Sequence, residues 1–106
     1  MLAMHEDIDL PSLRCLVALL DLRSVTRAAE HLGLSQPTVS HALARLRKRF
    51  GDPLLVRGRG EMVPTQRALA LHDTARLALQ SIKRLSAPPG TFRPEDERST
   101  FVLTIA

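Results

Sequence analysis

The chain has 106 residues, 44% of them hydrophobic and 25% charged, which indicates one small globular domain and excludes a disordered chain. Its single cysteine excludes an internal disulfide framework, and its scattered histidines exclude a structural zinc site. The longest apolar run, Leu16 to Leu20, is too short to cross a bilayer, and residues 1–8 lack the pattern of a signal peptide. We therefore expect a soluble cytoplasmic protein with no membrane partner.

The net charge of +4 is concentrated in the middle of the sequence. Residues 1–34 carry three basic and five acidic side chains, residues 35–67 carry seven and two, and residues 68–106 carry five and four. A basic segment of this kind is either a solvated face or a surface that binds nucleic acid.

Two helices are predicted in the first third of the chain. Apolar residues at helical spacing predict a helix from about Leu10 to Leu22. Ser24 is a suitable N-cap for a second helix, and Gly33 is suited to end it because glycine accepts the left-handed conformation. The buried stripe of the second helix is expected to be Val25, Ala28, Ala29 and Leu32.

A third helix follows after a very short connection. Ser35 is its expected N-cap, Pro37 falls in the first turn, and Gly51 with Pro53 ends it. Its buried stripe is expected to be Val39, Leu43, Leu46 and Phe50. Two short helices joined by so tight a turn must cross steeply, which is the geometry of a helix-turn-helix. Because the only aromatic residues are three phenylalanines, we expect an aliphatic core and a mainly helical fold.

The next segment is predicted to be a hairpin followed by a long helix. Strand-like runs at Leu54–Arg57 and Glu61–Pro64 flank the turn Gly58-Arg59-Gly60. Thr65 is suited to cap a fourth helix that runs to about Ser86. The apolar positions of this helix form a heptad seam: Ala68, Leu71, Ala75, Ala78, Ile82 and Leu85. The seam can pack back on the domain core, but we favour dimerisation because the pattern continues over the whole helix.

The outward face of the third helix is the main candidate site. Glutamine matches the donor and acceptor of adenine, serine and histidine bond to several bases, and proline contacts the thymine methyl group. The expected base contacts are Gln36, Pro37, Thr38, Ser40, His41 and Arg45. The basic run at 45–49 continues towards the helix end, where it is better placed for phosphates. The competing interpretation is a solvated helix face, but the tight turn and the segregated charge favour DNA.

Further DNA contacts are predicted from the hairpin and from the helix starts. Arg57 and Arg59 are candidates to enter a minor groove, although they also suit an ordinary exposed turn. The expected phosphate contacts are Ser24, Thr26, Ser35, Lys48 and Thr65. Plain helix capping is the alternative role for the hydroxyl groups, and the two roles can coexist.

No residue pattern in the sequence predicts an enzyme or a metal site. Cys15 lies within the apolar pattern of the first helix, where a packed side chain is the expected role. His5, His31 and His72 belong to separate elements, and no nucleophile–base pair or phosphate-binding loop accompanies them. We therefore expect no catalytic residue and no cofactor within these 106 residues.

The stretch from Leu10 to Leu85 resembles the N-terminal DNA-binding region of LysR-type transcriptional regulators. The matching motifs are Ser24-Val25-Thr26-Arg27-Ala28-Ala29, Leu34-Ser35-Gln36-Pro37-Thr38-Val39-Ser40, Leu43 with Leu46, Phe50 to Arg57, and Val63-Pro64-Thr65. The resemblance implies a winged helix-turn-helix at 1–64 and a linker helix at 65–86 that dimerises antiparallel to its mate. Residues 87–98 are rich in proline and charge, which predicts a hinge, and residues 99–106 are strand-like. The resemblance implies that 99–106 is the first strand of an effector-binding domain.

The resemblance also implies partners and ligands. Members of this family are typically tetramers that bind an interrupted dyad in double-stranded DNA and respond to a small-molecule co-inducer bound by the effector domain. Their base-contacting positions fall on Gln36, Pro37, Ser40 and His41, with a wing contact near Arg57 or Arg59. The sequences at 52–57 and 62–68 are most similar to regulators of nodulation and aromatic degradation.

Two positions depart from the family pattern. Many members have arginine where this chain has His41, and a histidine adds a pH dependence because it titrates near neutral pH. Relatives often place the arginine of the wing tip one residue later than Arg59. The sequence therefore does not decide whether Arg57 or Arg59 enters the minor groove.

The alternative function is a helix-turn-helix that binds protein, with the fourth helix as its partner surface. Steep salt dependence of duplex binding would argue against it.

Overall fold

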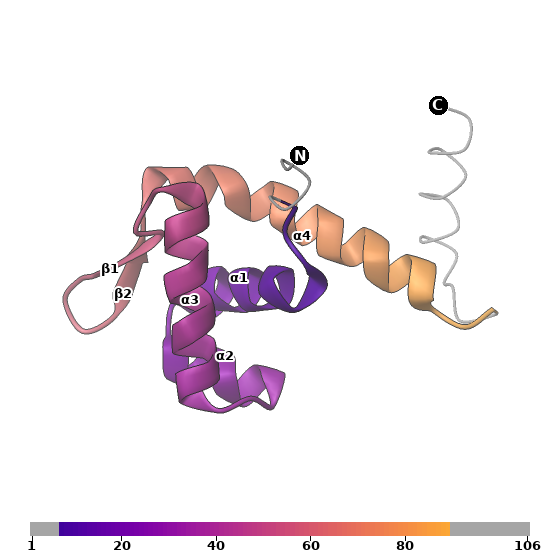
Figure 1. Cartoon of the computed structure of the whole chain (residues 1–106), viewed down its shortest axis with the longest axis horizontal. Coiled ribbons are helices and arrows are strands. Elements are labelled where there is room, and N and C mark those ends of the chain that lie inside the picture. The colour runs from indigo at the N-terminus through magenta and orange to yellow at the C-terminus, as the bar shows by residue number, and fades with distance from the viewer. Residues whose placement is uncertain (1–6, 90–106) are drawn as a thin grey trace.

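The computed structural model describes residues 7–89 of the chain. Its elements are α1 (Leu10–Leu22), α2 (Val25–Leu32), α3 (Gln36–Phe50), β1 (Leu55–Arg57), β2 (Met62–Pro64) and α4 (Gln66–Ser86). This order confirms the predicted, mainly helical fold with its hairpin, although both strands begin one residue later than expected (Figure 1). His5, most of the predicted hinge at 87–98 and the predicted strand at 99–106 lie outside the described residues.

Polar side chains cap the starts of the helices. The three predicted caps, Ser24, Ser35 and Thr65, each accept a hydrogen bond from the backbone N–H three residues later, at 3.0 to 3.2 Å. Asp9, which was not predicted, caps α1 in the same way at 2.8 Å. Hydrogen bonds from Ser12 lower the pKa of the Asp9 carboxyl below its ordinary value of 3.8. The four caps fix where each helix begins.

The ends of the first three helices depend on residues with a left-handed backbone. Gly33 (φ 69°) and Gly51 (φ 60°) end α2 and α3, as predicted. Arg23 (φ 54°) does the same for α1, although a residue with a side chain rarely adopts this conformation. The connections at 23–24 and 33–35 are therefore short, and α2 packs against both α1 and α3.

The hydrophobic core is built around α1, which packs against α2, α3 and α4. Every buried residue within 7–89 is hydrophobic. The largest fully buried side chains are all aliphatic: Leu19, Leu46, Leu54, Leu55 and Val39. Phe50, which was predicted in the buried stripe of α3, is only half-buried, and its ring lies 6.0 Å from the guanidinium carbons of Arg49 and Arg67. The core is thus aliphatic, as the composition predicts.

The two strands form an antiparallel hairpin that projects from the helices as a wing. Its register is Leu55–Pro64, Val56–Val63 and Arg57–Met62. Leu54, just before β1, is fully buried and has a left-handed backbone (φ 65°). This residue anchors the base of the wing in the core.

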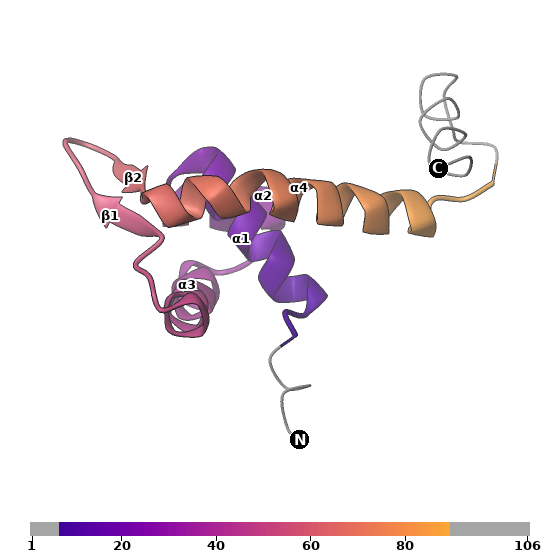
Figure 2. The ribbon, with the colours of Figure 1, turned by 90° about the horizontal axis from the view of Figure 1, so that it is seen from above.

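One part of α4 belongs to the core and the other part leaves it. Ala68 and Ala75 are 0% and 7% exposed, whereas Leu85 is 86% exposed. The Nε2 atom of His72 lies 2.6 Å from Oδ1 of Asp21, which joins α4 to α1. The far end of α4 extends beyond the other helices (Figures 1 and 2). The predicted dimer seam is therefore corrected at Ala68 and Ala75, because both pack inside this chain. None of the helices within 7–89 is long and apolar enough to span a membrane.

Candidate nucleic-acid interface

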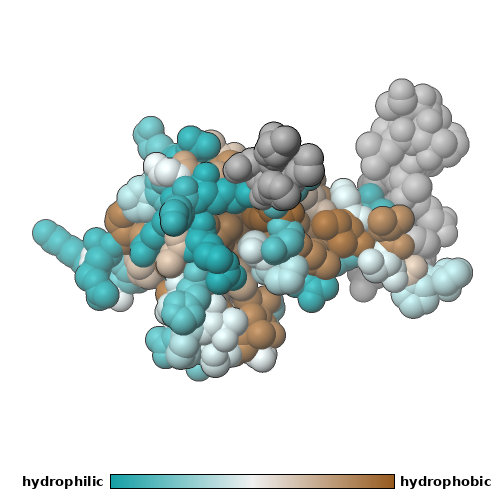
Figure 3. Space-filling model, in the orientation of Figure 1, coloured by the Kyte–Doolittle hydropathy of each residue, from teal (hydrophilic) through white to brown (hydrophobic). Residues whose placement is uncertain are grey.

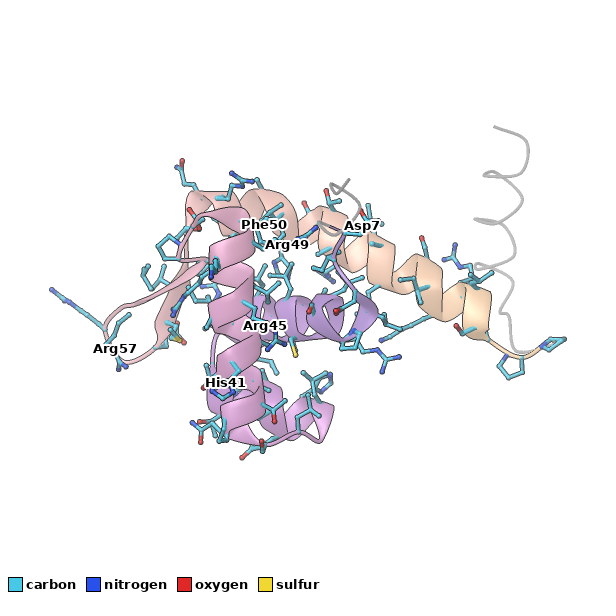
Figure 4. The ribbon with its side chains drawn as sticks, in the orientation of Figure 1. Asp7, His41, Arg45, Arg49, Phe50 and Arg57 are labelled. Atoms are coloured by element: carbon cyan, nitrogen blue, oxygen red, sulfur yellow. The ribbon has the colours of Figure 1, made fainter. Side chains whose placement is uncertain are left out.

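The face of α3 that points away from the core carries the predicted base-contacting residues. All six of them are exposed, and so is Lys48: Gln36, Pro37, Thr38, Ser40, His41 and Arg45. Val39, Leu43 and Leu46 are buried on the opposite side of the helix. Hydrophilic side chains gather over α3 and the wing (Figure 3), and His41 and Arg45 follow one another along the helix (Figure 4). The structure therefore brings these residues together on one surface.

The wing adds basic side chains beside this surface. Arg57 ends β1 and Arg59 lies in the tip, and both are exposed. Figure 4 shows Arg57 near the end of the hairpin that lies farthest from the helices. The tip is closed by a hydrogen bond of 2.9 Å from the N–H of Gly58 to the carbonyl oxygen of Glu61. Both candidate arginines are therefore accessible from solvent.

A groove of about 920 Å³ lies between the wing and the starts of α2 and α3. Thr26, Gln36 and Ser40 lie along its helical wall, and Val56 and Arg57 lie along its wing wall. Its charged lining consists of four arginines and one glutamate: Arg23, Arg27, Arg47, Arg57 and Glu61. The excess of positive charge suits the groove to a phosphate backbone.

Arg47, in the basic run, also has a structural role. Its Nε donates to the carbonyl oxygen of Pro53 at 2.7 Å, and its Nη2 donates to that of Leu55 at 2.8 Å. The guanidinium therefore ties α3 to the start of the wing. The position of Arg47 on the helix, next to the buried Leu43 and the half-buried Phe50, was the signal in the sequence for an inward role.

Asp52 and Thr65 form a second connection at the base of the wing. The Oδ2 atom of Asp52 accepts hydrogen bonds from the Thr65 hydroxyl at 2.6 Å and from the N–H of Leu54 at 2.8 Å. These two bonds, the Thr65 bond first, lower the pKa of the Asp52 carboxyl below 3.8. Because its hydroxyl donates to Asp52 and accepts from the N–H of Ala68, Thr65 is a structural cap, which is the alternative role predicted for it.

The other predicted hydroxyl contacts lie at the starts of α2 and α3. Ser24 caps α2, and the hydroxyl oxygens of Ser35 and Thr38 are 2.7 Å apart. The side-chain amide nitrogen of Gln36 donates to the hydroxyl oxygen of Thr26 at 2.9 Å, which joins α2 to α3. No residue pattern in the sequence indicated this last bond.

The structure places Cys15 in the core and His72 beside Asp21. Burial raises the pKa of the Cys15 thiol above its ordinary value of 9.0, which disfavours the thiolate. Within residues 7–89, no three His, Cys, Asp or Glu side chains are grouped to hold a metal ion. The contact of His72 with Asp21 joins residues 51 positions apart, which explains why the sequence did not reveal it.

Comparison with known proteins identifies this architecture. Residues 10–69, more than half of the chain, match the family described as bacterial regulatory helix-turn-helix proteins of the lysR family. The chain belongs to the LysR family. The described residues form a LysR-type DNA-binding domain of the winged helix-turn-helix class.

Curated LysR relatives are much longer than this chain. The HTH-type transcriptional regulator LinR of Sphingobium indicum is 45% identical over 98 residues, which cover 92% of this chain and 32% of LinR. Nodulation protein D 2 of Sinorhizobium fredii is 43% identical over 102 residues, which cover 95% of this chain and 32% of that protein. The chain therefore spans about a third of the length of these LysR proteins. The second match agrees with the predicted similarity to nodulation regulators.

The fold matches solved LysR domains. The crystal structure of BenM_DBD with catB site 1 DNA has a TM-score of 0.68 and 28% sequence identity to this chain. The match covers 74% of this chain and 88% of that one. The LysR match at 10–69 spans α1, α2, α3, the wing and the start of α4, and so includes the elements that form the exposed surface described above.

Proposed function

We propose that this chain binds double-stranded DNA in a sequence-dependent way, with α3 in the major groove and the wing at the neighbouring minor groove. One observation carries the proposal: the exposed polar face of α3 and the basic wing stand on either side of an open, positively charged groove. A similar LysR domain, BenM_DBD, has been solved in complex with DNA, which supports the same use of this fold.

The residues of α3 have different proposed roles. Gln36, Ser40 and His41 bond to base edges, and Pro37 contacts thymine methyl groups. Arg45 and Thr38 also face the bases, whereas Lys48, Ser24 and Ser35 contact phosphates. The phosphate contacts hold the helix in register and the base contacts select the sequence.

The wing supplies minor-groove recognition in this proposal. A·T-rich minor grooves are narrow and strongly negative, so an inserted arginine favours A·T-rich flanks. Arg59→Ala should therefore weaken binding more at A·T-rich than at G·C-rich flanks in a duplex titration. Equal losses at both flanks would assign Arg59 to the phosphates.

A DNA dyad has two half-sites and therefore requires two chains. We assign the dimer contact to the part of the α4 seam that is not buried in the core of this chain. These residues are Leu71, Ala78 and Ile82, which are partly buried, and Leu85, which is exposed. As in the family, we further propose that the protein forms a tetramer and responds to a co-inducer bound outside these 106 residues. Its proposed location is the cytoplasm, and its proposed role is transcription regulation without enzymatic activity.

The test is selection of bound duplexes from a random-sequence pool at about 0.15 M salt. We expect enrichment of two half-sites at a fixed spacing of about 34 Å or a multiple of it. Gln36→Ala should then cost about 1–3 kcal/mol on the selected duplex and little on random DNA. The matched control is Gln80→Ala, which removes an exposed glutamine of α4.

Equal loss on both DNAs would remove the base-reading role of Gln36. If the protein retains DNA at low salt but enriches no sequence, its binding is electrostatic and not sequence-specific. Absence of binding at every salt concentration would favour the protein-binding alternative.

A further inference from the structure

Thr26 and Gln36 are the residues that connect α2 and α3 by a side-chain hydrogen bond on the exposed surface. The amide nitrogen of Gln36 donates to the hydroxyl oxygen of Thr26 at 2.9 Å. Both side chains are exposed, and both line the groove between α3 and the wing. The bond therefore lies at the place where the proposed function puts a base pair.

Both ends of this bond are held by rigid backbone. Thr26 lies in the first turn of α2, two residues after the cap Ser24, and Gln36 directly follows the cap Ser35. Threonine is branched at Cβ and has few side-chain conformers, so its hydroxyl is an acceptor at a nearly fixed position. Glutamine has three rotatable side-chain bonds and gains its orientation from that acceptor.

The bond decides which groups of Gln36 remain for DNA. A glutamine amide has one oxygen acceptor and two N–H donors, and Thr26 takes one of the donors. The oxygen and the second N–H remain, and a paired acceptor and donor is the arrangement that recognises adenine in the major groove. A side chain ordered before binding also loses less conformational entropy when it meets the base.

We infer that Thr26 is a positioning residue, whose hydroxyl fixes the amide of Gln36 and thereby sets the base preference at the position that Gln36 reads. This inference rests on the proposed function. It differs from a phosphate contact by Thr26, because a phosphate contact carries no sequence information and strengthens binding to all duplexes alike.

The test compares base preferences of five proteins by selection from the same random-duplex pool: the unchanged chain, Thr26→Val, Thr26→Ser, Gln36→Ala, and the double variant Thr26→Val/Gln36→Ala. Valine keeps the branched shape of threonine without the hydroxyl, and serine keeps the hydroxyl without the branch. We expect Thr26→Val to lower discrimination at the base pair read by Gln36 by about tenfold, with the other positions unchanged.

The remaining variants separate positioning from other roles. Thr26→Ser should retain most of the preference. The double variant should discriminate no worse at that base pair than Gln36→Ala alone, because Thr26 acts through Gln36. A uniform loss of affinity by Thr26→Val on all sequences would assign the hydroxyl to a phosphate and overturn the inference.

A second measurement uses the free protein and needs no DNA. The side-chain amide proton signals of Gln36 should be distinct from those of Gln80, an exposed glutamine of α4, and should move towards them in Thr26→Val. Signals of Gln36 that do not change in Thr26→Val would overturn the inference. An equal loss of preference in Thr26→Val and Thr26→Ser would also overturn it, since packing and not the hydroxyl would then be responsible.

The outcomes for the two proposals are distinct. A flat profile from the unchanged chain would reject sequence-specific binding and, with it, the role of Thr26. A peaked profile from the unchanged chain that persists in Thr26→Val would reject the role of Thr26 alone.

Discussion

At the scale of single residues, two neighbouring basic side chains of α3 have different roles, one in the fold and one in the proposed DNA contact. Arg47 turns inward and donates to two carbonyl oxygens at the base of the wing, whereas Lys48 is exposed on the surface proposed to meet DNA. Two adjacent positions, one turned towards the fold and one towards the ligand, allow stability and affinity to be measured separately.

Arg47→Met should lower the free energy of unfolding by about 1–3 kcal/mol, because two carbonyl oxygens lose a charged donor. Lys48→Met is the matched control and should change it by less than about 0.5 kcal/mol while weakening duplex binding and reducing its salt slope. Urea unfolding and duplex titration measure the two effects. Equal destabilisation by both variants would contradict the inward role of Arg47.

Asp52 predicts a pH dependence of stability. Its pKa is lowered by the hydrogen bonds from Thr65 and Leu54, so the charged carboxylate stabilises the fold above about pH 4, and this contribution is lost as the pH falls through the lowered pKa. Asp52→Asn should be less stable than the unchanged chain at pH 7, and the difference should shrink at about pH 3. Thermal unfolding at both values tests this, and a constant difference would speak against it.

At the scale of elements, the sequence predicts the helices well and their mutual connections poorly. Ser24, Ser35 and Thr65 were predictable because a cap is decided by residues three positions apart. The bond between His72 and Asp21 was not, because it depends on packing between α4 and α1. The candidate site shows the same division. Its exposed residues follow from helical periodicity, whereas the bond of Gln36 to Thr26 requires the crossing of two helices.

The wing tip depends on the absence of a side chain at Gly58. A Cβ atom there would lie 2.6 Å from Cγ2 of Val63, closer than such atoms approach, and 3.0 Å from the carbonyl oxygen of Glu61, which is tighter than most such contacts. Gly58→Ala should therefore displace the strands and weaken binding to A·T-rich flanks, where the wing acts.

The double variant Gly58→Ala/Val63→Ala provides the control for Gly58→Ala, because it removes the nearer obstacle. We expect it to recover part of the affinity, with the remaining deficit due to the Glu61 carbonyl. Duplex titration of both variants against A·T-rich and G·C-rich flanks measures the effect. Full affinity of Gly58→Ala would show that the tip adjusts without cost.

At the scale of the whole molecule, α4 divides its apolar residues between this chain and the proposed partner. The split was not predictable from the heptad pattern, because Ala68 and Leu85 belong to the same seam, yet Ala68 is fully buried in this chain and Leu85 is exposed. Hydrophobic side chains gather over the stretch of α4 that leaves the other helices (Figure 3).

Leu85→Asp should shift the chain towards monomer and abolish preference for two half-sites at fixed spacing, while binding to a single half-site persists. The matched control is Leu69→Asp, since Leu69 is 50% exposed and lies roughly 160° around the helix from Leu85. Sedimentation velocity and titration with single and double half-sites measure both effects. A dimer that survives Leu85→Asp and is lost in Leu69→Asp would place the interface on the other side of α4.

The attachment of α4 to α1 has a consequence for the DNA. Over its first turns α4 is joined to the domain by buried alanines and by the bond between His72 and Asp21. A dimer made through the far end of α4 therefore has no flexible connection between its two DNA-binding surfaces. With 21 residues, α4 is about 32 Å long and acts as a rigid ruler. When half-sites stand at a different separation, the adjustment must come from the double helix, and the cost of bending or twisting it becomes part of what the protein recognises.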